Sequence, residues 1–379
     1  MTARTDTAVT PKTDVLLVGS LPYAAVASRR RARVSQPNAK RGSHTMERDT
    51  QAALQIDEAA STVNATYVAP SATELLAPGA KVGQLFMRNV AQPYFLQRLT
   101  ERTYFFGGGF YTTTFYVGDE GVLVFDPPEN QGSNLLQAIA EVTRLPVTAI
   151  VYSHNHADHI VAADVLLGAA SAAGVRHVRV IASAETDEKM KRLGCRLPAP
   201  TETVDWPKGS FEFEGLRVEL HGFTRAAHTD DAAVLLLVQE KVAHLPDLVN
   251  GDQPPFRNFA QSENYVYYRS NVNELGALDW THLVGGHGNV GSKEDIRFYN
   301  TFLDDLEAAV GNAMASTQFA DVVDMTKHNN HAALMVPWIT TVASRATDEL
   351  RAQYGGFYGF EVSTPANAEM VALSRVSYR

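Results

Sequence analysis

Several residues with metal-binding side chains lie close together in the middle of the 379-residue chain. They are His154, His156, Asp158 and His159. They directly follow the apolar, β-branched run 147–151, which is typical of a buried strand. Unpaired imidazoles and carboxylates are costly to bury, but both are common metal ligands. Side chains alternate along an extended segment, so His154 and His156 point to the same side. Asp158 and His159 can turn toward a second metal position close by. This loop therefore predicts ligands for two metal ions rather than solvated histidines.

Further ligands must come from separate segments, because one short loop cannot surround an ion. His228 precedes the strand-like run 232–238, and His287 follows a short strand and two glycines that let the backbone approach an ion closely. Asp247 lies in an otherwise apolar stretch, where a lone carboxylate is costly unless cations neutralise it. We therefore expect Asp247 to bridge two ions. Asp252, in a turn-like Asn-Gly-Asp-Gln sequence, is the competing choice.

The order and setting of these ligands resemble the metallo-β-lactamase superfamily. The matching residues are the His154-x-His156-x-Asp158-His159 loop, then His228, Asp247 and His287. The resemblance covers roughly residues 90–300. It implies one metal held by His154, His156 and His228, and a second held by Asp158, His159 and His287, with Asp247 bridging. It also implies a supporting role for Asp126 at the end of run 121–126, where a plain turn aspartate is an equal interpretation.

Such a ligand set predicts hydrolytic chemistry. Two zinc-like ions can share a water, lower its pKa enough to leave hydroxide at neutral pH, and polarise a carbonyl or phosphoryl oxygen. We expect a hydroxide bridging two Zn²⁺ ions per chain to cleave a carboxylic ester or lactone, with Asp158 passing the proton to the leaving alkoxide and Asp247 as the other catalytic carboxylate. Imidazole and carboxylate ligands also admit iron or manganese.

Alternative functions use the same fold. Many zinc β-lactamases of the resembling family have a cysteine ligand where this chain offers Asp247, which disfavours β-lactam hydrolysis. Thioester, sulfate-ester and phosphodiester hydrolysis stay open beside it. A di-iron redox protein is disfavoured by His156, where the superfamily's di-iron reductases carry glutamate, and a non-catalytic metal-binding protein by the filling of every ligand position. Cys195, the one cysteine, has no histidine near it in sequence and is expected to be structural or incidental.

Composition restricts the partners. A formal charge of −9 and a pI near 5.7 argue against a broad phosphate-binding surface. No apolar run approaches the ~20 residues of a membrane span. We therefore expect a small-molecule substrate, no nucleic acid and no membrane partner, with the oligomeric state open. We expect a cytoplasmic location; a secreted or periplasmic one is the alternative, because residues 25–27 mimic a signal-peptidase site although residues 1–14 before it have no net positive charge.

The chain divides into three segments. Residues 1–75, rich in Ala, Thr, Ser and charge, are expected to have little fixed structure, and Met46 is a candidate for the true start. Residues 76–300 are expected to form the hydrolase domain, and residues 301–379 a helical extension packed on it.

Short β-rich runs alternate with helical patterns from residue 92 onward. Strands are expected at 94–99, 111–117, 122–125, 147–152, 177–181, within 211–222, and at 233–239 and 242–245, and helices at 135–143, 162–173, 294–314 and 338–354. This order predicts an α/β fold, a four-layer αββα sandwich of two mixed β-sheets flanked by helices, with the metal loops on one edge.

Three other segments carry expectations of their own. The glycines 107–109 are expected to form a loop or bulge rather than a phosphate site. The turn-rich segment 253–268 is expected to select the substrate, with a tyrosine among Tyr265, Tyr267 and Tyr268 able to donate a hydrogen bond to an oxyanion. His328 and His331 are expected to be surface residues.

Overall fold

The structure, a computed structural model, describes residues 59–326 and 330–378, which belong to one compact unit over residues 54–379. Its larger sheet has seven strands that neighbour one another in chain order. They are β3 (Phe95–Arg98), β4 (Thr103–Gly108), β5 (Tyr111–Val117), β6 (Val122–Phe125), β7 (Val147–Val151), β8 (Arg179–Ser183) and β9 (Glu202–Val204). Pairing is antiparallel from β3 to β6 and parallel from β6 to β9.

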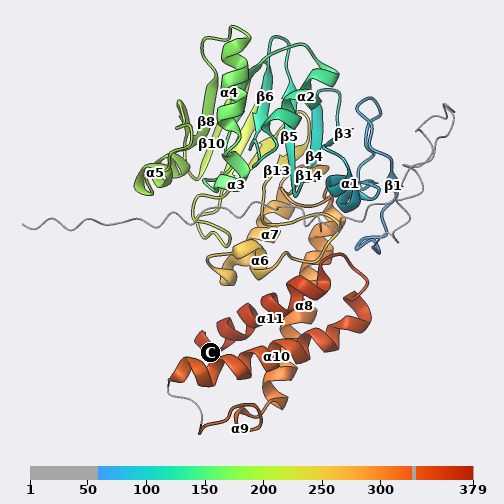
Figure 1. The fold of residues 1–379 in the computed structure, drawn as a ribbon, viewed down its shortest axis with the longest axis vertical. Helices are drawn as coiled ribbons and strands as arrows, with labels where there is room; N and C mark the ends of the chain where they lie inside the picture. Colours follow the sequence, from blue (N-terminus) through green and yellow to red (C-terminus); the bar gives the residue numbers. More distant parts are fainter. Residues whose placement is uncertain (1–58, 327–329, 379) are drawn as a thin grey trace, which may run out of the picture. The chain divides into compact units, whose positions relative to one another are not determined.

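Helices connect the parallel strands, because parallel neighbours need long crossovers. α2 (Gly132–Val142) joins β6 to β7, α3 (Ala157–Ile160) and α4 (Ala163–Ala172) join β7 to β8, and α5 (Ala184–Arg192) precedes β9. In α2 the apolar residues Leu135, Ala138 and Ile139 recur at helical spacing and are buried. These helices cover the outer face of the larger sheet (Figure 1).

The smaller sheet has five strands, again in chain order. They are β10 (Lys208–Phe213), β11 (Leu216–Gly222), β12 (Ala233–Leu237), β13 (Val242–His244) and β14 (His282–Val284). β10 to β13 are antiparallel, and β14 is parallel to β13 after a crossover that contains α6 (Asn258–Gln261) and α7 (Tyr268–Ala277).

The core alternates between the two faces of each sheet. On β6, Leu123 and Phe125 face the other sheet, whereas Val122 and Val124 pack on the helical side. On β12, the odd-numbered positions of 233–237 join the central core and the even-numbered ones face helices on the opposite side. The two inner faces form one cluster and the two outer faces form two others, so the predicted four-layer αββα sandwich is confirmed.

Strand β4 is one of the strands that the sequence did not predict. β4 includes Gly107 and Gly108, which the sequence assigns to a loop. A Cβ on Gly107 would lie 2.3 Å from the ring of Phe95 on the neighbouring strand β3. Glycine at this position therefore permits close packing inside the sheet, and the expectation of a loop there was wrong.

The C-terminal part is helical, with α8 (Lys293–Ser316), α9 (Phe319–Val322), α10 (His331–Tyr354) and α11 (Phe360–Ser377). Ser292 and Asp295 form a capping box at the start of α8. α8 contacts α10 and α11, as Figure 1 also shows. Leu306 of α8 and Val342 of α10 share one buried cluster with Leu283 of β14. The helices therefore share a core with the smaller sheet. α11 was not expected, and its sequence carries Pro365 in an otherwise weakly patterned stretch.

Before β3, the described chain forms β1 (Tyr67–Val68), β2 (Lys81–Val82) and α1 (Leu85–Ala91). Lys81 is fully buried and binds the carboxylate of Asp295 at 2.9 Å. The predictions for residues 1–58, including the signal-like residues 25–27 and the start at Met46, lie outside the described residues.

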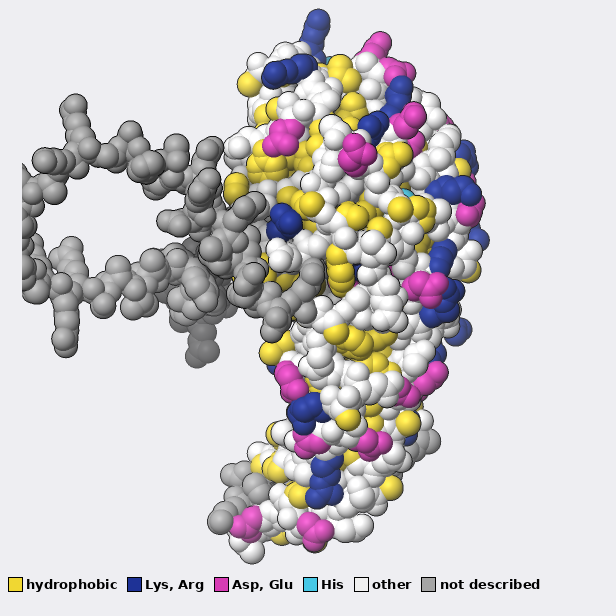
Figure 2. Space-filling model, turned by 90° about the vertical axis from the view of Figure 1, so that its right-hand side faces the viewer, with side chains coloured by type: hydrophobic (Ala, Val, Ile, Leu, Met, Phe, Trp, Pro, Cys, Tyr) yellow, Lys and Arg dark blue, Asp and Glu magenta, His cyan; other side chains and the backbone are white. Residues whose placement is uncertain are grey.

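Within the described residues, no helix has both the length and the apolar composition needed to cross a membrane. On the face drawn in Figure 2, acidic and basic side chains of the described residues are interspersed.

Candidate metal centre

Loops at one edge of the sandwich bring the predicted ligands together. These loops follow β7, precede β12, and follow β13 and β14. They carry His154, His156, Asp158, His159, His228, Asp247 and His287. Because β7 ends at residue 151, the histidine loop emerges directly from the buried sheet and can reach over its edge.

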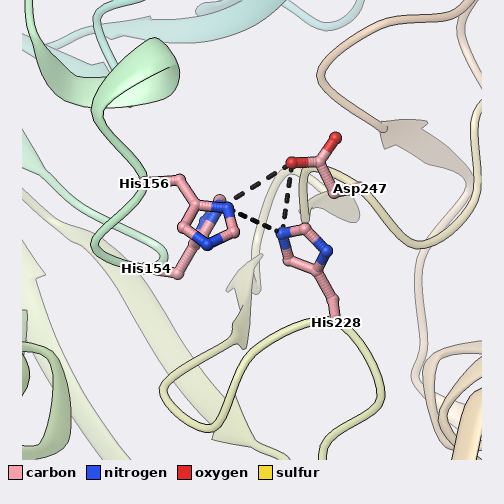
Figure 3. A group of neighbouring side chains, drawn as sticks. All are labelled: His154, His156, His228 and Asp247. Atoms are coloured by element: carbon pink, nitrogen blue, oxygen red, sulfur yellow. Dashed lines mark hydrogen bonds and ion pairs between the residues drawn. The ribbon is translucent and has the colours of Figure 1, made fainter. Parts of the chain in front are cut away.

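A first group of four side chains is drawn in Figure 3. It contains His154, His156, His228 and Asp247, and one ligand atom from each lies within 4.8 Å of the others. His228 Nε2 lies 3.0 Å from His156 Nδ1 and 3.3 Å from Asp247 Oδ2. His154 Nε2, 3.8 Å from the same oxygen, is buried and has no hydrogen-bond partner in the described structure. A buried nitrogen with no partner, facing a carboxylate, fits a site for a cation.

A second group lies beside the first. It contains Asp158, His159 and His287. Asp158 Oδ2 lies 3.5 Å from His159 Nε2 and 3.9 Å from His287 Nε2. Asp247 reaches this group as well, with Oδ2 3.0 Å from His159 Nε2 and Oδ1 3.1 Å from His287 Nε2. Asp247 therefore lies between the two groups, at the place expected of a bridging ligand, while Asp252 lies outside both.

The electrostatics of the pair of groups favour bound cations. Burial lowers the pKa of His156 to about 4 and that of His154 well below its usual range, so both are neutral at pH 7, the form that binds metals. Burial also lowers the pKa of His159, but Asp247 outweighs burial and raises it to about 9. Burial raises the pKa of Asp247, but His159, His228 and His287 outweigh it and hold that pKa well below its usual range. Asp247 is thus a buried carboxylate that needs positive charge around it.

Asp126 supports the histidine loop from behind. Its Oδ1 accepts a hydrogen bond from the backbone N–H of Ser153 at 2.8 Å, and its Oδ2 lies 2.8 Å from His244 Nε2. Ser153 Oγ in turn lies 2.9 Å from His154 Nδ1. Asp126 is therefore more than a strand-end turn residue, because it fixes Ser153, the residue next to the candidate ligand His154. His244 was missed in the sequence, although it stands three residues before Asp247.

A buried charged network holds the other side of the loop, and sequence analysis missed it. Asp231 accepts a hydrogen bond from the backbone N–H of Asn155 at 2.8 Å, between the first two histidines. Its other oxygen accepts from Lys189 Nζ of α5 at 3.1 Å. Lys189 also binds Thr229 and Asp230, which follow His228 directly. One lysine therefore links α5 to two of the ligand segments.

His287 is oriented by its own surroundings. Its Nδ1 lies 2.9 Å from the carbonyl oxygen of Phe110, and its backbone N–H donates to Asn250 Oδ1 at 3.1 Å. Gly286 before it has a φ of +88°, and a Cβ there would lie 2.8 Å from Pro246. Glycine is therefore required at this turn, as the sequence suggested for the Gly-Gly-His pattern.

A cavity of about 340 Å³ opens onto both groups. Its lining residues are His156, Ala157, Asp158, His228, Asp247, Phe256, Ala260, Gln261 and His287. The segment 253–268 therefore contributes Phe256, Ala260 and Gln261 to the wall, and part of it does face the site. The side chain of Asp158 is 41% exposed, so this carboxylate is open to the cavity.

The predicted role of a tyrosine from segment 253–268 was wrong. Tyr268 is buried and donates to the carbonyl oxygen of Leu248, and Tyr265 donates to Glu307 of α8. Tyr267 packs under Arg225. None of the three lines the cavity. Tyr111 lies closer, with its ring centroid 5.1 Å from that of His287, and its hydroxyl donates to Glu129.

The remaining reactive side chains lie elsewhere. Cys195 is half-buried and packs against the cluster outside the larger sheet. His331 is exposed at the start of α10, as expected of a surface residue, and His328 lies outside the described residues.

Comparison with known proteins agrees with this geometry. The model of the metallo-beta-lactamase superfamily matches residues 106–287, a segment that contains both ligand groups. No curated protein matches the chain significantly. Among solved structures, a metallo-beta-lactamase from Pontibacter korlensis is similar at 20% identity and a TM-score of 0.45, covering 55% of this chain and 98% of that one. Metallo-beta-lactamase IND-7 is similar at 21% identity and 0.45, covering 56% and 99%.

Residues 106–287 of the chain match the metallo-beta-lactamase superfamily, the family that its ligand pattern resembles. Its members are generally hydrolases that bind metal ions, and the two groups of histidine and aspartate side chains are candidate metal ligands of that kind.

Proposed function

We propose that the protein is a hydrolase of small carboxylic esters or lactones that uses two zinc ions. The observation that carries the proposal is the place of Asp247, whose oxygens lie within 3.3 Å of imidazole nitrogens from both groups. A carboxylate that lies between two sets of potential metal ligands suits two adjacent metal ions.

Bound zinc would supply hydroxide at neutral pH, by lowering the pKa of a water shared between two ions, and would polarise the scissile carbonyl. The residues that would hold the two ions fall into the two groups described above. His154, His156 and His228 would hold one ion, Asp158, His159 and His287 the other, and Asp247 both. Of the two catalytic carboxylates, Asp247 orders the ligands, and Asp158 is open to the cavity and able to pass a proton to the leaving alkoxide.

Two features support the ester or lactone class. The ligand set contains no thiolate, since Cys195 packs beside the larger sheet, which separates this site from those that use a cysteine ligand. The cavity has the volume of a small-molecule site, and the formal charge of −9 argues against a broad phosphate-binding surface. Acidic and basic side chains are interspersed on the face in Figure 2. Imidazole and carboxylate ligands favour zinc, with iron or manganese as the other fits.

A hydrolysis panel on zinc-reconstituted protein tests the proposal. It contains lactones, aryl esters, β-lactams, thioesters, sulfate esters and bis-aryl phosphates, with His156→Ala and Asp247→Ala as controls. We expect turnover of lactones or aryl esters, loss of it in both variants, and loss on chelation but not on thiol alkylation. Turnover confined to another class of compound would replace esters and lactones as the proposed substrate class. Turnover unaffected by the variants or by chelation would reject the mechanism.

Metal analysis of the purified protein distinguishes a hydrolase from a redox protein and from a non-catalytic metal-binding protein. About two zinc ions per chain supports hydrolysis. Iron with a visible charge-transfer band would favour a redox centre instead, and bound metal without any turnover would favour a metal-binding role.

A further inference from the structure

The cavity wall contains a turn of unusual handedness. Four consecutive non-glycine residues, Asn258 to Gln261, have φ of +54°, +49°, +54° and +56°. Such residues visit the left-handed region singly, because the Cβ crowds the following carbonyl. Here they form a left-handed turn closed by backbone bonds, such as Ser262 N–H to Asn258 O at 3.0 Å. Something outside the turn must therefore offset its cost.

A side chain of the C-terminal extension clamps this turn. Asn367 of α11 is fully buried, and its Oδ1 accepts the backbone N–H of Phe259 at 2.9 Å. Its Nδ2 donates to the carbonyl oxygen of Pro255 at 2.7 Å. One amide thus binds the backbone both before and inside the turn. The buried ring of Phe259, 4.7 Å from that of Tyr268, anchors the turn in the core beside it.

The turn separates two cavities. Phe256 and Gln261 line the metal-facing cavity, and both also line a second space of about 700 Å³. The far wall of that space is α11, through Ala366, Met370 and Leu373. Directly after the turn, the backbone N–H of Glu263 donates to the carbonyl oxygen of His228 at 3.1 Å. The turn is therefore connected to a ligand segment on one side and to α11 on the other.

We propose that Asn367 is a positioning residue for substrate binding. It acts through the left-handed turn, whose residues Ala260 and Gln261 form the wall that the substrate meets beside the ligands. The C-terminal helices are then part of the binding site, although no residue of α11 lines the metal-facing cavity. This inference rests on the proposed function only for its kinetic test.

Asn367→Ala tests the clamp directly. We expect amide hydrogen exchange in residues 259–262 to accelerate at least tenfold, because one hydrogen bond to the turn and one to the backbone before it are lost. For a substrate found by the panel, we expect KM to rise at least fivefold with kcat within twofold, since the wall loosens but the ligands stay. Asn312→Ala is the matched control, because Asn312 is also an asparagine of a C-terminal helix whose amide donates a hydrogen bond, here to Glu349 on the exposed surface.

The outcomes decide the proposal. Unchanged amide exchange in Asn367→Ala would show that the conformation of the turn does not depend on Asn367. Faster exchange with an unchanged KM would show that the turn does not contact the bound substrate. If no substrate is hydrolysed, the proposed function fails, while the exchange result still supports or rejects the clamp.

A second variant covers the case in which Asn367→Ala does not fold. Glycine takes positive φ without steric cost, so Ala260→Gly should slow amide exchange of the turn. In the double variant with Asn367→Ala, it should bring KM most of the way back to the parent value. Exchange that is not slowed by Ala260→Gly would reject the claim that backbone strain is what Asn367 offsets.

Discussion

Asp247 is the residue on which both candidate metal positions depend. It is buried, has a positive φ of 67°, and faces imidazoles of both groups. Asp252, its competitor in the sequence, instead accepts hydrogen bonds from Tyr67 and from the backbone of Thr62. The two aspartates stand five positions apart but serve different parts of the molecule.

Asp247→Asn should lose metal where Asp252→Asn does not. Partners that only support a ligand typically change metal affinity about 10–100-fold, and loss of a shared ligand should exceed that range. We expect zinc content to fall from about two ions per chain to one or none, measured by elemental analysis after dialysis. Equal zinc loss in Asp252→Asn would contradict the assignment of the bridge.

Lys189 is a second residue whose importance comes from its contacts. Its side chain is 7% exposed, and it neutralises the buried carboxylate of Asp231, which holds the backbone of Asn155. Removing one member of such a pair leaves an uncompensated charge in the interior.

Lys189→Met should therefore lower the free energy of unfolding by about 3 kcal/mol. Lys191→Met is the control, because its exposed pair with Asp187 should contribute less than about 0.5 kcal/mol. Urea unfolding of both variants measures the difference. A Lys189→Met variant as stable as the control would show that solvent screens this network.

At the scale of the elements, strand ends and short turns carry the site. β7 and β14 end at the cavity edge, and α6 is a left-handed turn whose residues each cost about 1–2 kcal/mol of backbone strain. β14 also begins with a buried histidine, His282, whose Nε2 lies 3.1 Å from the carbonyl oxygen of Leu76 and whose Nδ1 lies 3.0 Å from Thr281 Oγ1.

His282 should make stability depend on pH. Burial lowers its pKa below 6.5 in the folded state, so the unfolded chain binds the proton more tightly. Its stabilising contribution is therefore complete above pH 6.5 and is lost as pH falls through that value toward the folded pKa. We expect unfolding free energy to drop more between pH 7.5 and 5.5 in the parent than in His282→Gln, measured by urea titration. An equal drop would mean that His282 stays solvated.

At the scale of the whole molecule, the sandwich and the C-terminal helices share one apolar cluster. Leu306 of α8 and Val342 of α10 are fully buried in it together with Leu283 of β14. Elements that bury the same surface lose it together when either unfolds.

Leu306→Ala should therefore destabilise sheet and helices in a single transition. We expect a loss of about 3 kcal/mol, typical of a buried leucine, with far- and near-ultraviolet circular dichroism melting together. Val336→Ala on the exposed side of α10 should change little. Two separated transitions in the parent would indicate that the helices form a separate domain.

The sequence by itself predicted the seven candidate ligands and the layers of the fold. The spacing of the histidines after β7 and the apolar alternation of the strands are local patterns, and they identified all seven ligand candidates and the αββα sandwich. Only the tertiary structure decided which residues support those candidate ligands and which residues line the cavity. Lys189, His244 and Asn367 act through partners far away in the chain, and the conformation of Asn258 to Gln261 contradicts its residue types. Such features depend on which segments the fold brings together, and no local pattern in the sequence carries that information.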